Sequence, residues 1–307
     1  MKQDAVFQEV VNVNQPGPKP SWLRRRLPAM GRNAVVDQAV RQGGLHTVCE
    51  EAHCPNQMEC YGRGEATFLL LGPNCTRRCT FCAVEKNAPA PLDPDEPQRI
   101  ARAVAELGLA FCVLTMVTRD DLPDGGAEHV AQTIQAVRQA CPGLGVEVLI
   151  SDLGGSTDAL LTVLETGPEV LNHNVETVPR LYGQVRPQAD YRRSIELLAR
   201  TLSHRPAQVA KSGLMLGLGE TREEVCAVME DLRRAGCLLL TLGQYLAPSN
   251  RHHPVVDWVT PETFESYKEE ARKRGFVGVA SAPYVRSSYQ AGRLYEAALS
   301  SGRVIPN

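Results

Sequence analysis

The stretch CTRRCTFC, residues 75–82, places three cysteines at C-x3-C-x2-C spacing: Cys75, Cys79 and Cys82. It follows the apolar run Phe68–Leu71 and a Gly-Pro pair that breaks regular structure. A short apolar run bounded by a turn signal favours a buried strand. We therefore expect the three thiols to share one loop at the end of that strand.

A second group of three cysteines, Cys49, Cys54 and Cys60, precedes this loop at C-x4-C-x5-C spacing. The two groups together use six of the ten cysteines in the chain. Each group offers three thiolates where a closed metal site usually has four. The shared deficit indicates iron–sulfur chemistry in which another ligand completes each site.

Disulfides and structural zinc are the alternatives for these cysteines. We expect the chain to stay in the cytoplasm, where thiols remain reduced, because it shows neither a charged-then-apolar leader nor an 18-residue apolar run. Zinc sites usually pair two C-x2-C knuckles or add histidines at fixed spacing, and no second knuckle follows Cys82. Three thiolates of one loop better suit three corners of a cubane iron–sulfur cluster, which leaves its fourth iron open.

Longer segments of the chain resemble a known family. A C-x3-C-x2-C loop after a strand, with Phe81 before its last cysteine, is similar to the radical S-adenosylmethionine (SAM) superfamily. The upstream cysteine group narrows the resemblance to the lipoyl synthase family. Four further segments agree with that family: TRDDLPDGGAEH at 118–129, NHNVETV at 172–178, KSGLMLGLGET at 211–221 and VRSSY at 285–289. The similarity runs from about Gly31 to about Gly292, with small variations at Val175 and Ser212.

This resemblance implies a radical SAM sulfurtransferase with two 4Fe–4S clusters and SAM as cosubstrate. The cluster that cleaves SAM to a 5′-deoxyadenosyl radical would be held by Cys75, Cys79 and Cys82. An auxiliary cluster, the sulfur donor in this family, would be held by Cys49, Cys54, Cys60 and the Ser288 oxygen. The implied reaction inserts two sulfur atoms at carbons 6 and 8 of a protein-bound octanoyl-lysine and yields lipoyl-lysine. The residues alone leave two other functions open, another sulfur-inserting radical SAM enzyme and a non-catalytic iron–sulfur scaffold.

The resemblance also implies partners. The substrates would be octanoylated lipoyl carrier domains, namely the glycine-cleavage H protein and acyltransferase subunits of 2-oxoacid dehydrogenases. Ferredoxin or flavodoxin would supply electrons, and an iron–sulfur carrier protein is a further expected partner of a monomeric chain. A net charge of −2, from 33 basic and 35 acidic residues, argues against a nucleic-acid partner, and no membrane partner is expected. The basic run Arg24–Arg26 is a candidate docking patch for an acidic carrier.

Seven residues are candidate SAM contacts: Gly125, Gly126, Asn172, Asn174, Glu176, Arg193 and Lys211. Glu176 is the candidate for the ribose hydroxyls, and Arg193 and Lys211 are candidates for the SAM carboxylate or for local charge balance. Polar groups at an apolar strand end cost stability unless they are paired or used, which favours SAM and substrate contacts for the cluster that also contains His173. A histidine taken alone is more often structural. The scattered cysteines are expected to be small buried hydrophobic groups: Cys112, Cys141, Cys226 and Cys237.

Apolar runs rich in β-branched residues alternate with helical patterns along the rest of the chain, as in βαβ units. The predicted strands are Ala66–Leu71, Phe111–Thr118, Gly145–Ile150, Val170–Asn174, Val209–Leu216, Leu238–Tyr245 and Gly278–Ser281. The predicted helices are Pro94–Leu107, Ala127–Ala140, Ser156–Glu165, Tyr191–Ser203, Thr221–Ala235 and Pro261–Lys273. We expect a helix start at Asp93 and a capping box of Thr221 with Glu224.

This alternation predicts an α/β fold, and the resemblance implies a partial TIM-type (β/α)6 radical SAM barrel. Its N-terminal and C-terminal extensions would carry the auxiliary cluster. We expect an N-terminal extension at 1–64, the barrel at 65–282, and a C-terminal extension with the RSSY motif at 283–307. The first twenty residues are expected to form an extended arm. The suspected functional segments follow the carboxyl ends of predicted strands, where α/β barrels place their sites.

Overall fold

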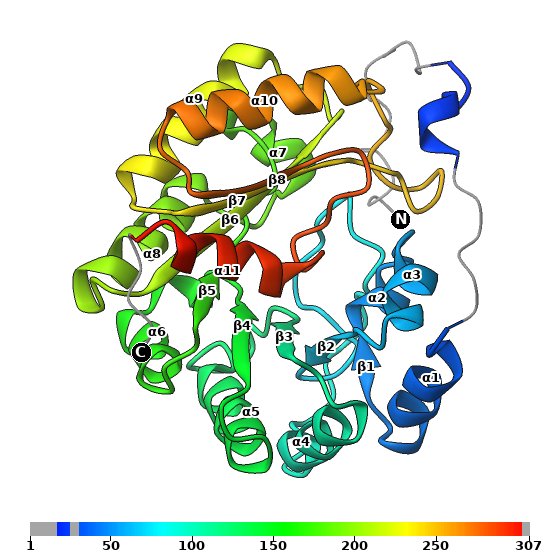
Figure 1. The fold of residues 1–307 in the computed structure, drawn as a ribbon, viewed down its shortest axis with the longest axis vertical. Coiled ribbons are helices and arrows are strands. Elements are labelled where there is room, and N and C mark those ends of the chain that lie inside the picture. Colours follow the sequence, from blue (N-terminus) through cyan, green and yellow to red (C-terminus); the bar gives the residue numbers. More distant parts are fainter. Residues whose placement is uncertain (1–16, 25–30, 303–307) are drawn as a thin grey trace, which may run out of the picture.

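The computed structural model describes residues 17–24 and 31–302 (Figure 1). Most of the expected N-terminal arm lies outside the described residues. So do Arg25 and Arg26 of the candidate docking patch. Among the described residues, no helix is both long and apolar enough to cross a membrane.

Eight strands form one open sheet whose spatial order follows the chain order. The first strand, β1 (His46–Thr47), runs antiparallel to the second, and all later neighbours are parallel. The parallel strands are β2 (Thr67–Leu70), β3 (Phe111–Met116), β4 (Gly145–Leu149), β5 (Val170–Asn172), β6 (Val209–Leu216), β7 (Leu239–Gln244) and β8 (Gly278–Ser281). The sheet does not close, because β1 and β8 each have a single neighbour. The expected partial barrel is confirmed.

Six helices connect successive parallel strands and cover the outside of the curved sheet (Figure 1). They are α4 (Glu96–Leu107), α5 (Ala127–Ala140), α6 (Thr157–Glu165), α8 (Tyr191–His204), α9 (Arg222–Arg234) and α10 (Pro261–Lys273). The predicted capping box is confirmed at α9, where Thr221 Oγ1 accepts from the Glu224 N–H and Glu224 Oε2 accepts from the Thr221 N–H.

The predicted helix start at Asp93 is wrong by two residues. Helix α4 begins at Glu96, and Asp95 is its N-cap residue. The Asp93 carboxylate accepts from the Asp95 N–H at 2.9 Å, which makes a local turn before the helix.

Several short elements were not predicted. They are β1, α1 (Asn33–Gln42), α2 (Val48–Glu51), α3 (Gln57–Gly62), α7 (Tyr182–Val185), α11 (Ala291–Ser300) and the 3-10 turns at Ser21–Leu23, Leu153–Gly155 and Pro179–Leu181. Of these, α11 covers the N-terminal ends of the strands. Its Leu294 packs with Val170, Val209 and Leu239, which are the first residues of β5, β6 and β7. Figure 1 shows α11 lying across the sheet.

Between β8 and α11 the chain passes through the interior of the barrel. A Cβ atom at Gly243, on β7, would lie 2.0 Å from the Val285 carbonyl oxygen, so only glycine permits this approach. Further along, the Ser287 hydroxyl hydrogen-bonds to Asn172 and Asn174, at the end of β5. The segment between β8 and α11, called the return segment below, places the RSSY motif inside the barrel.

Candidate active site

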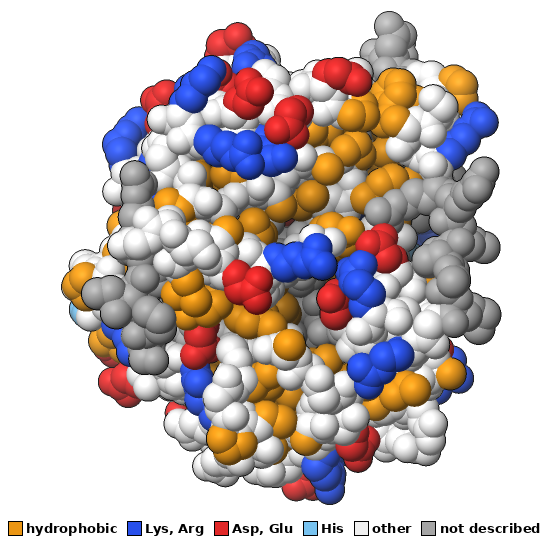
Figure 2. Space-filling view, in the orientation of Figure 1, with side chains coloured by type: hydrophobic (Ala, Val, Ile, Leu, Met, Phe, Trp, Pro, Cys, Tyr) orange, Lys and Arg blue, Asp and Glu red, His pale blue; other side chains and the backbone are white. Residues whose placement is uncertain are grey.

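One cavity of about 1140 Å³ lies in the interior of the open barrel. All six cysteines of the two groups line it, as do Ser288, Asn174 and Glu176. Figure 2 shows a hollow near the centre of one face, with acidic and basic side chains at its rim. The structure therefore brings both predicted cysteine groups to a single space.

The loop that carries the second cysteine group lies at the carboxyl end of β2, as predicted. Gly72, with φ at 80°, makes the turn out of the strand. The Cys75 N–H donates to the Glu85 carbonyl at 2.8 Å, and the Thr80 N–H donates to the Val185 carbonyl at 3.0 Å. These bonds tie the loop to itself and to the end of α7.

The side chain of Arg77 anchors this loop from within. Its buried guanidinium donates to both oxygens of Asp120, at 2.9 and 2.8 Å, and to both oxygens of Asp152, at 2.8 and 2.6 Å. Asp120 follows β3 and Asp152 follows β4. Burial disfavours the charged form of Asp152, but its bonds to Arg77 outweigh that effect and lower its pKa to about 2. The sequence pattern did not single out Arg77 for this role.

Cys49 is buried and the other five cysteines of the two groups are half-buried. Burial, reinforced by the charges of Cys79 and Cys75, raises the pKa of Cys82 to about 12. Burial, reinforced by Cys54, likewise raises the pKa of Cys49 to about 12. Neither group is locked into disulfides, because all ten cysteines are free. Crowded thiols of this kind ionise when a metal centre supplies positive charge.

The donor sets fit iron–sulfur clusters. No three of the described His, Cys, Asp and Glu side chains converge closely enough to hold a single metal ion. In a cubane cluster each cysteine binds a separate iron, which suits thiols that share a cavity without meeting at one point.

Two short helices hold the first cysteine group beside the sheet. Thr47, the last residue of β1, caps α2 by accepting from the Glu50 N–H at 3.3 Å. Its hydroxyl also shares a hydrogen bond of 2.8 Å with the buried Tyr61 hydroxyl of α3. Cys49 on α2 and Cys60 on α3 are thereby fixed relative to the edge of the barrel.

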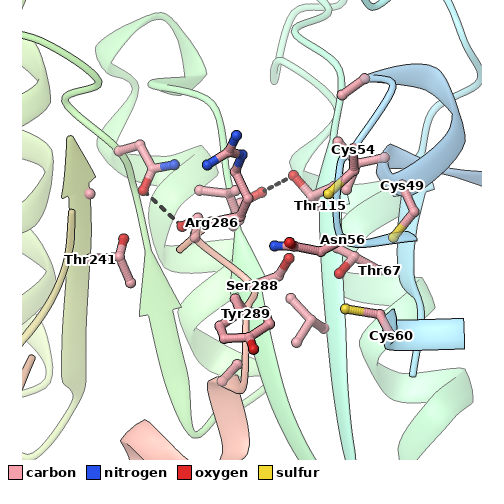
Figure 3. A pocket seen from close by; sticks show the side chains of 18 of the residues that line it. Cys49, Cys54, Asn56, Cys60, Thr67, Thr115, Thr241, Arg286, Ser288 and Tyr289 are labelled. Carbon is pink, nitrogen blue, oxygen red and sulfur yellow. Dashed lines mark hydrogen bonds between the residues drawn. The ribbon is translucent and has the colours of Figure 1, made fainter. Parts of the chain in front are cut away.

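The return segment brings Ser288 to this first group. Asn56 Nδ2 donates to the Tyr284 carbonyl at 2.7 Å, and the Tyr289 hydroxyl donates to Glu59 at 2.8 Å. Both contacts join residues far apart in sequence. Figure 3 shows Ser288 and the three cysteines of the first group around one part of the cavity. All four predicted ligands of the auxiliary cluster thus line one cavity.

The polar end of β5 contains one residue with a structural role. The His173 ring nitrogens hydrogen-bond to the Ile150 carbonyl at 2.9 Å and the Ser194 hydroxyl at 3.0 Å. Burial lowers the pKa of His173 to about 4, so the ring is neutral near pH 7. Both ring nitrogens are thus engaged within the fold.

The next polar residues face the cavity beside Cys79. Asn174 Nδ2 donates to Glu176 Oε1 at 3.1 Å, and Glu176 has a strained φ of 64°. Arg186 donates to the carbonyls of Asn174 and Val175, both at 3.1 Å. Burial raises the pKa of Cys79, while the charge of Arg186 opposes that rise. Arg186 was missed because an arginine in a loop is ordinarily solvated, and no spacing signal marks it.

Two of the predicted SAM contacts are buried in the sheet away from the cavity lining. Lys211 Nζ pairs with Glu147 at 2.7 and 2.8 Å, and both side chains are 0% exposed. Asn172 Nδ2 donates to the same carboxylate at 2.8 Å. Lys211 was a candidate for the SAM carboxylate or for local charge balance, and its pairing with Glu147 is of the second kind.

Three further candidates also lie outside the cavity lining. Arg193 is half-exposed, and its guanidinium lies 3.4 Å from Asp152. The Gly125 N–H donates to the Leu122 carbonyl, and the Gly126 N–H donates to the Asp124 carboxylate. The N–H groups of Gly125 and Gly126 are therefore engaged within their own turn.

The four scattered cysteines lie apart from the site. Cys112 and Cys237 are fully buried, and Cys141 and Cys226 are half-buried. None of the four is among the described residues that line the cavity. This agrees with their expected role as small hydrophobic groups.

Comparison with known proteins identifies the family. A family profile described as Radical SAM superfamily matches residues 69–232. A curated relative from Trichlorobacter lovleyi, named lipoyl synthase, is 54% identical over 275 residues, covering 89% of this chain and 97% of the relative. Another lipoyl synthase, from Caldanaerobacter subterraneus subsp. tengcongensis, is 52% identical over 273 residues, with coverage of 89% and 95%. The chain belongs to the lipoyl synthase family.

Solved structures agree with the fold of this lipoyl synthase family member. Methylornithine synthase (PylB) superposes with a TM-score of 0.53 at 13% identity, covering 80% of this chain and 70% of that one. The FeFe-hydrogenase maturase HydG from Carboxydothermus hydrogenoformans gives 0.52 at 14% identity, with coverage of 88% and 77%. At such identities the likeness concerns the fold alone. Family membership makes the chain a radical SAM enzyme of the sulfurtransferase class, which implies a 4Fe–4S cluster and SAM.

Proposed function

We propose that this chain converts an octanoyl group, held on a lysine of a carrier domain, into a lipoyl group by inserting sulfur at carbons 6 and 8. The observation that carries the proposal is the cavity of about 1140 Å³ faced by both three-thiol groups. One group is enough for SAM cleavage, so a second group in the same space supports a separate source of sulfur.

The first task of the chain is to hold SAM and its cluster. Cys75, Cys79 and Cys82 would hold the cluster, whose chemistry with bound SAM would be the generation of a radical able to remove hydrogen from substrate carbons. Glu176 and Asn174 line the cavity beside this loop and are the proposed partners of the ribose hydroxyls.

We assign the SAM carboxylate to Arg186 in place of Lys211. Arg186 lines the cavity, and its charge acts on both Cys79 and Glu176. Its Nε is buried and has no hydrogen-bond partner within the described residues. A buried donor without a partner is costly, and a carboxylate ligand would satisfy it.

The second task is to hold the sulfur source. We propose that Cys49, Cys54 and Cys60 bind the auxiliary cluster and that Ser288 supplies its fourth ligand. A serine oxygen is a harder ligand than a thiolate and suits iron–sulfur iron less well. The Ser288 oxygen would therefore be the ligand that the auxiliary cluster loses most easily when it gives up sulfur.

The test is a single-turnover assay on the anaerobically reconstituted chain with SAM, dithionite and an octanoyl-lysine peptide, followed by mass spectrometry. The proposal expects dithiolated peptide with roughly two 5′-deoxyadenosines per lipoyl group, one for each hydrogen removed. Formation of 5′-deoxyadenosine without sulfur insertion would leave only the superfamily chemistry. If neither product forms with both clusters loaded, the chain acts as a scaffold.

A control variant distinguishes the roles proposed for the two thiol groups. Cys60→Ala should still cleave SAM but leave the peptide without sulfur. Octanoylated H protein and acyltransferase domains, with ferredoxin or flavodoxin as reductant, are the proposed physiological partners and can replace the peptide and dithionite in the same assay.

A further inference from the structure

The two serines of the RSSY motif differ in how they are held. Ser287 Oγ accepts from Asn172 Nδ2 at 2.8 Å and donates to Asn174 Oδ1 at 3.0 Å. The Ser288 hydroxyl makes no hydrogen bond within the described part of the chain, and Figure 3 shows it facing the side of the cavity where the first cysteine group lies. One hydroxyl is fully engaged and its neighbour is available as a ligand.

A buried ion pair orients Asn172, one of the two residues that bind Ser287. The second amide hydrogen of Asn172 goes to Glu147, which also accepts two hydrogen bonds from Lys211. These three residues lie on the neighbouring strands β4, β5 and β6, and all are 0% exposed. The charges fix the carboxylate, and the carboxylate fixes the orientation of the Asn172 amide.

The cost of this arrangement indicates that it serves a purpose beyond packing. Asn172 Oδ1 is buried and has no partner among the described residues. Both amide hydrogens are thus committed to Glu147 and Ser287 while the amide oxygen is left unpaired. Native proteins rarely leave a buried acceptor unpaired without a compensating role.

The neighbouring residues restrict the turn from the other side. The Tyr289 N–H donates to the Arg286 carbonyl at 3.0 Å, which closes a turn around the two serines. The Tyr289 hydroxyl is bound by Glu59 on α3. With Ser287 bound to β5 and Tyr289 bound to α3, the residue between them has little freedom.

We propose that Ser287 is a positioning residue: by binding Asn172 and Asn174 it aims Ser288 at the first cysteine group. The inference rests on the proposed function, in which Ser288 supplies the fourth cluster ligand. Asn174 also binds Glu176. The hydrogen bonds of Ser287 therefore connect the part of the cavity proposed to hold SAM with the part proposed to hold the auxiliary cluster.

The test compares Ser287→Ala, Ser287→Thr and the control Ser281→Ala in the anaerobically purified full-length chain. Ser281 is also a buried serine and is the last residue of β8, just before the return segment. Its hydroxyl donates to the Phe264 carbonyl, away from the cavity. Hydrogen exchange of the Tyr289 amide measures the turn directly. We expect Ser287→Ala to speed this exchange roughly tenfold, as for the loss of two neutral hydrogen bonds. Ser287→Thr should restore the protection, and Ser281→Ala should leave it unchanged.

A second readout follows the proposed ligand. With Cys75, Cys79 and Cys82 replaced by alanine, only the first group can hold a cluster, and a chelator should extract its first iron several-fold faster in Ser287→Ala. Unchanged exchange at Tyr289 and unchanged extraction would overturn the positioning role. If both respond but the chain makes no lipoyl product, the positioning role stands and the proposed function fails.

Discussion

Replacing Arg77 by alanine removes the anchor of the cysteine loop. The Arg77–Asp152 pair is buried, with side chains 6% and 0% exposed, and breaking such a pair from one side costs about 3–5 kcal/mol. The Asp120 partner is 41% exposed and adds at most about 1 kcal/mol. A fall in the Asp152 pKa from 3.8 to about 2 corresponds to roughly 2 kcal/mol at pH 7. Arg193 still lies near Asp152, so we expect a loss of about 3 kcal/mol.

The assay is urea unfolding of the cluster-free chain at pH 7, with Arg78→Ala as the matched control. Arg78 is the next residue, is exposed, and makes no ion pair within the described residues. Its replacement should change the free energy of unfolding by less than about 0.5 kcal/mol. Equal midpoints for Arg77→Ala and Arg78→Ala would refute the anchoring argument.

The pH dependence gives a second check on the same variant. The pKa of Asp152 is lowered in the folded chain, so its contribution to stability is fully present above the unfolded value of 3.8. That contribution is lost as the pH falls through about 2. The difference between wild type and Arg77→Ala should therefore shrink below pH 3.8. A gap that widens on acidification would contradict the assignment.

Three further predictions concern the buried pair, the serine ligand and the scattered cysteines. Lys211→Met should lower the free energy of unfolding by about 3–5 kcal/mol, because it leaves the Glu147 carboxylate buried without a counter-charge; adding Glu147→Gln should recover part of the loss in a urea titration, and no recovery would argue against the pairing. Ser288→Cys should keep the auxiliary cluster but slow sulfur release in single turnover, and normal release would contradict the role of the oxygen ligand. Cys237→Ala should leave the iron content unchanged by colorimetric assay, and lost iron would make it a ligand.

The barrel could be predicted because its strands and helices carry strong periodic patterns. The predicted helix Ala127–Ala140 matches α5 at both ends, and the predicted strand Val209–Leu216 matches β6. By contrast, α11 lacks a side-chain cap, since its N-cap residue is Gln290 in the left-handed conformation. The two-residue β1 and the four-residue α2 are too short for any period to show.

The site was partly predictable for a different reason. Cysteine spacing marks candidate ligands directly, so both thiol groups that line the cavity were singled out without knowledge of the fold. The polar groups were harder, because a polar residue on a buried strand is either used by a ligand or paired with another residue. Lys211 was left as a candidate for either role, and Glu147 in the apolar run of β4 is its opposite charge. The presence of two opposite charges in separate apolar strands is the sequence feature from which a buried ion pair could have been predicted.

The topology accounts for a proposed fourth ligand of the first group that comes from the far end of the chain. The first group precedes the barrel and lies against β1, at one edge of the open sheet. The connecting helices lie outside the sheet (Figure 1). After β8 the chain leaves the sheet and crosses the interior before α11 covers the strand ends. If Ser288 is the ligand that we propose, it reaches the first group only when the whole barrel is folded, so the auxiliary site would be complete only when the barrel is complete.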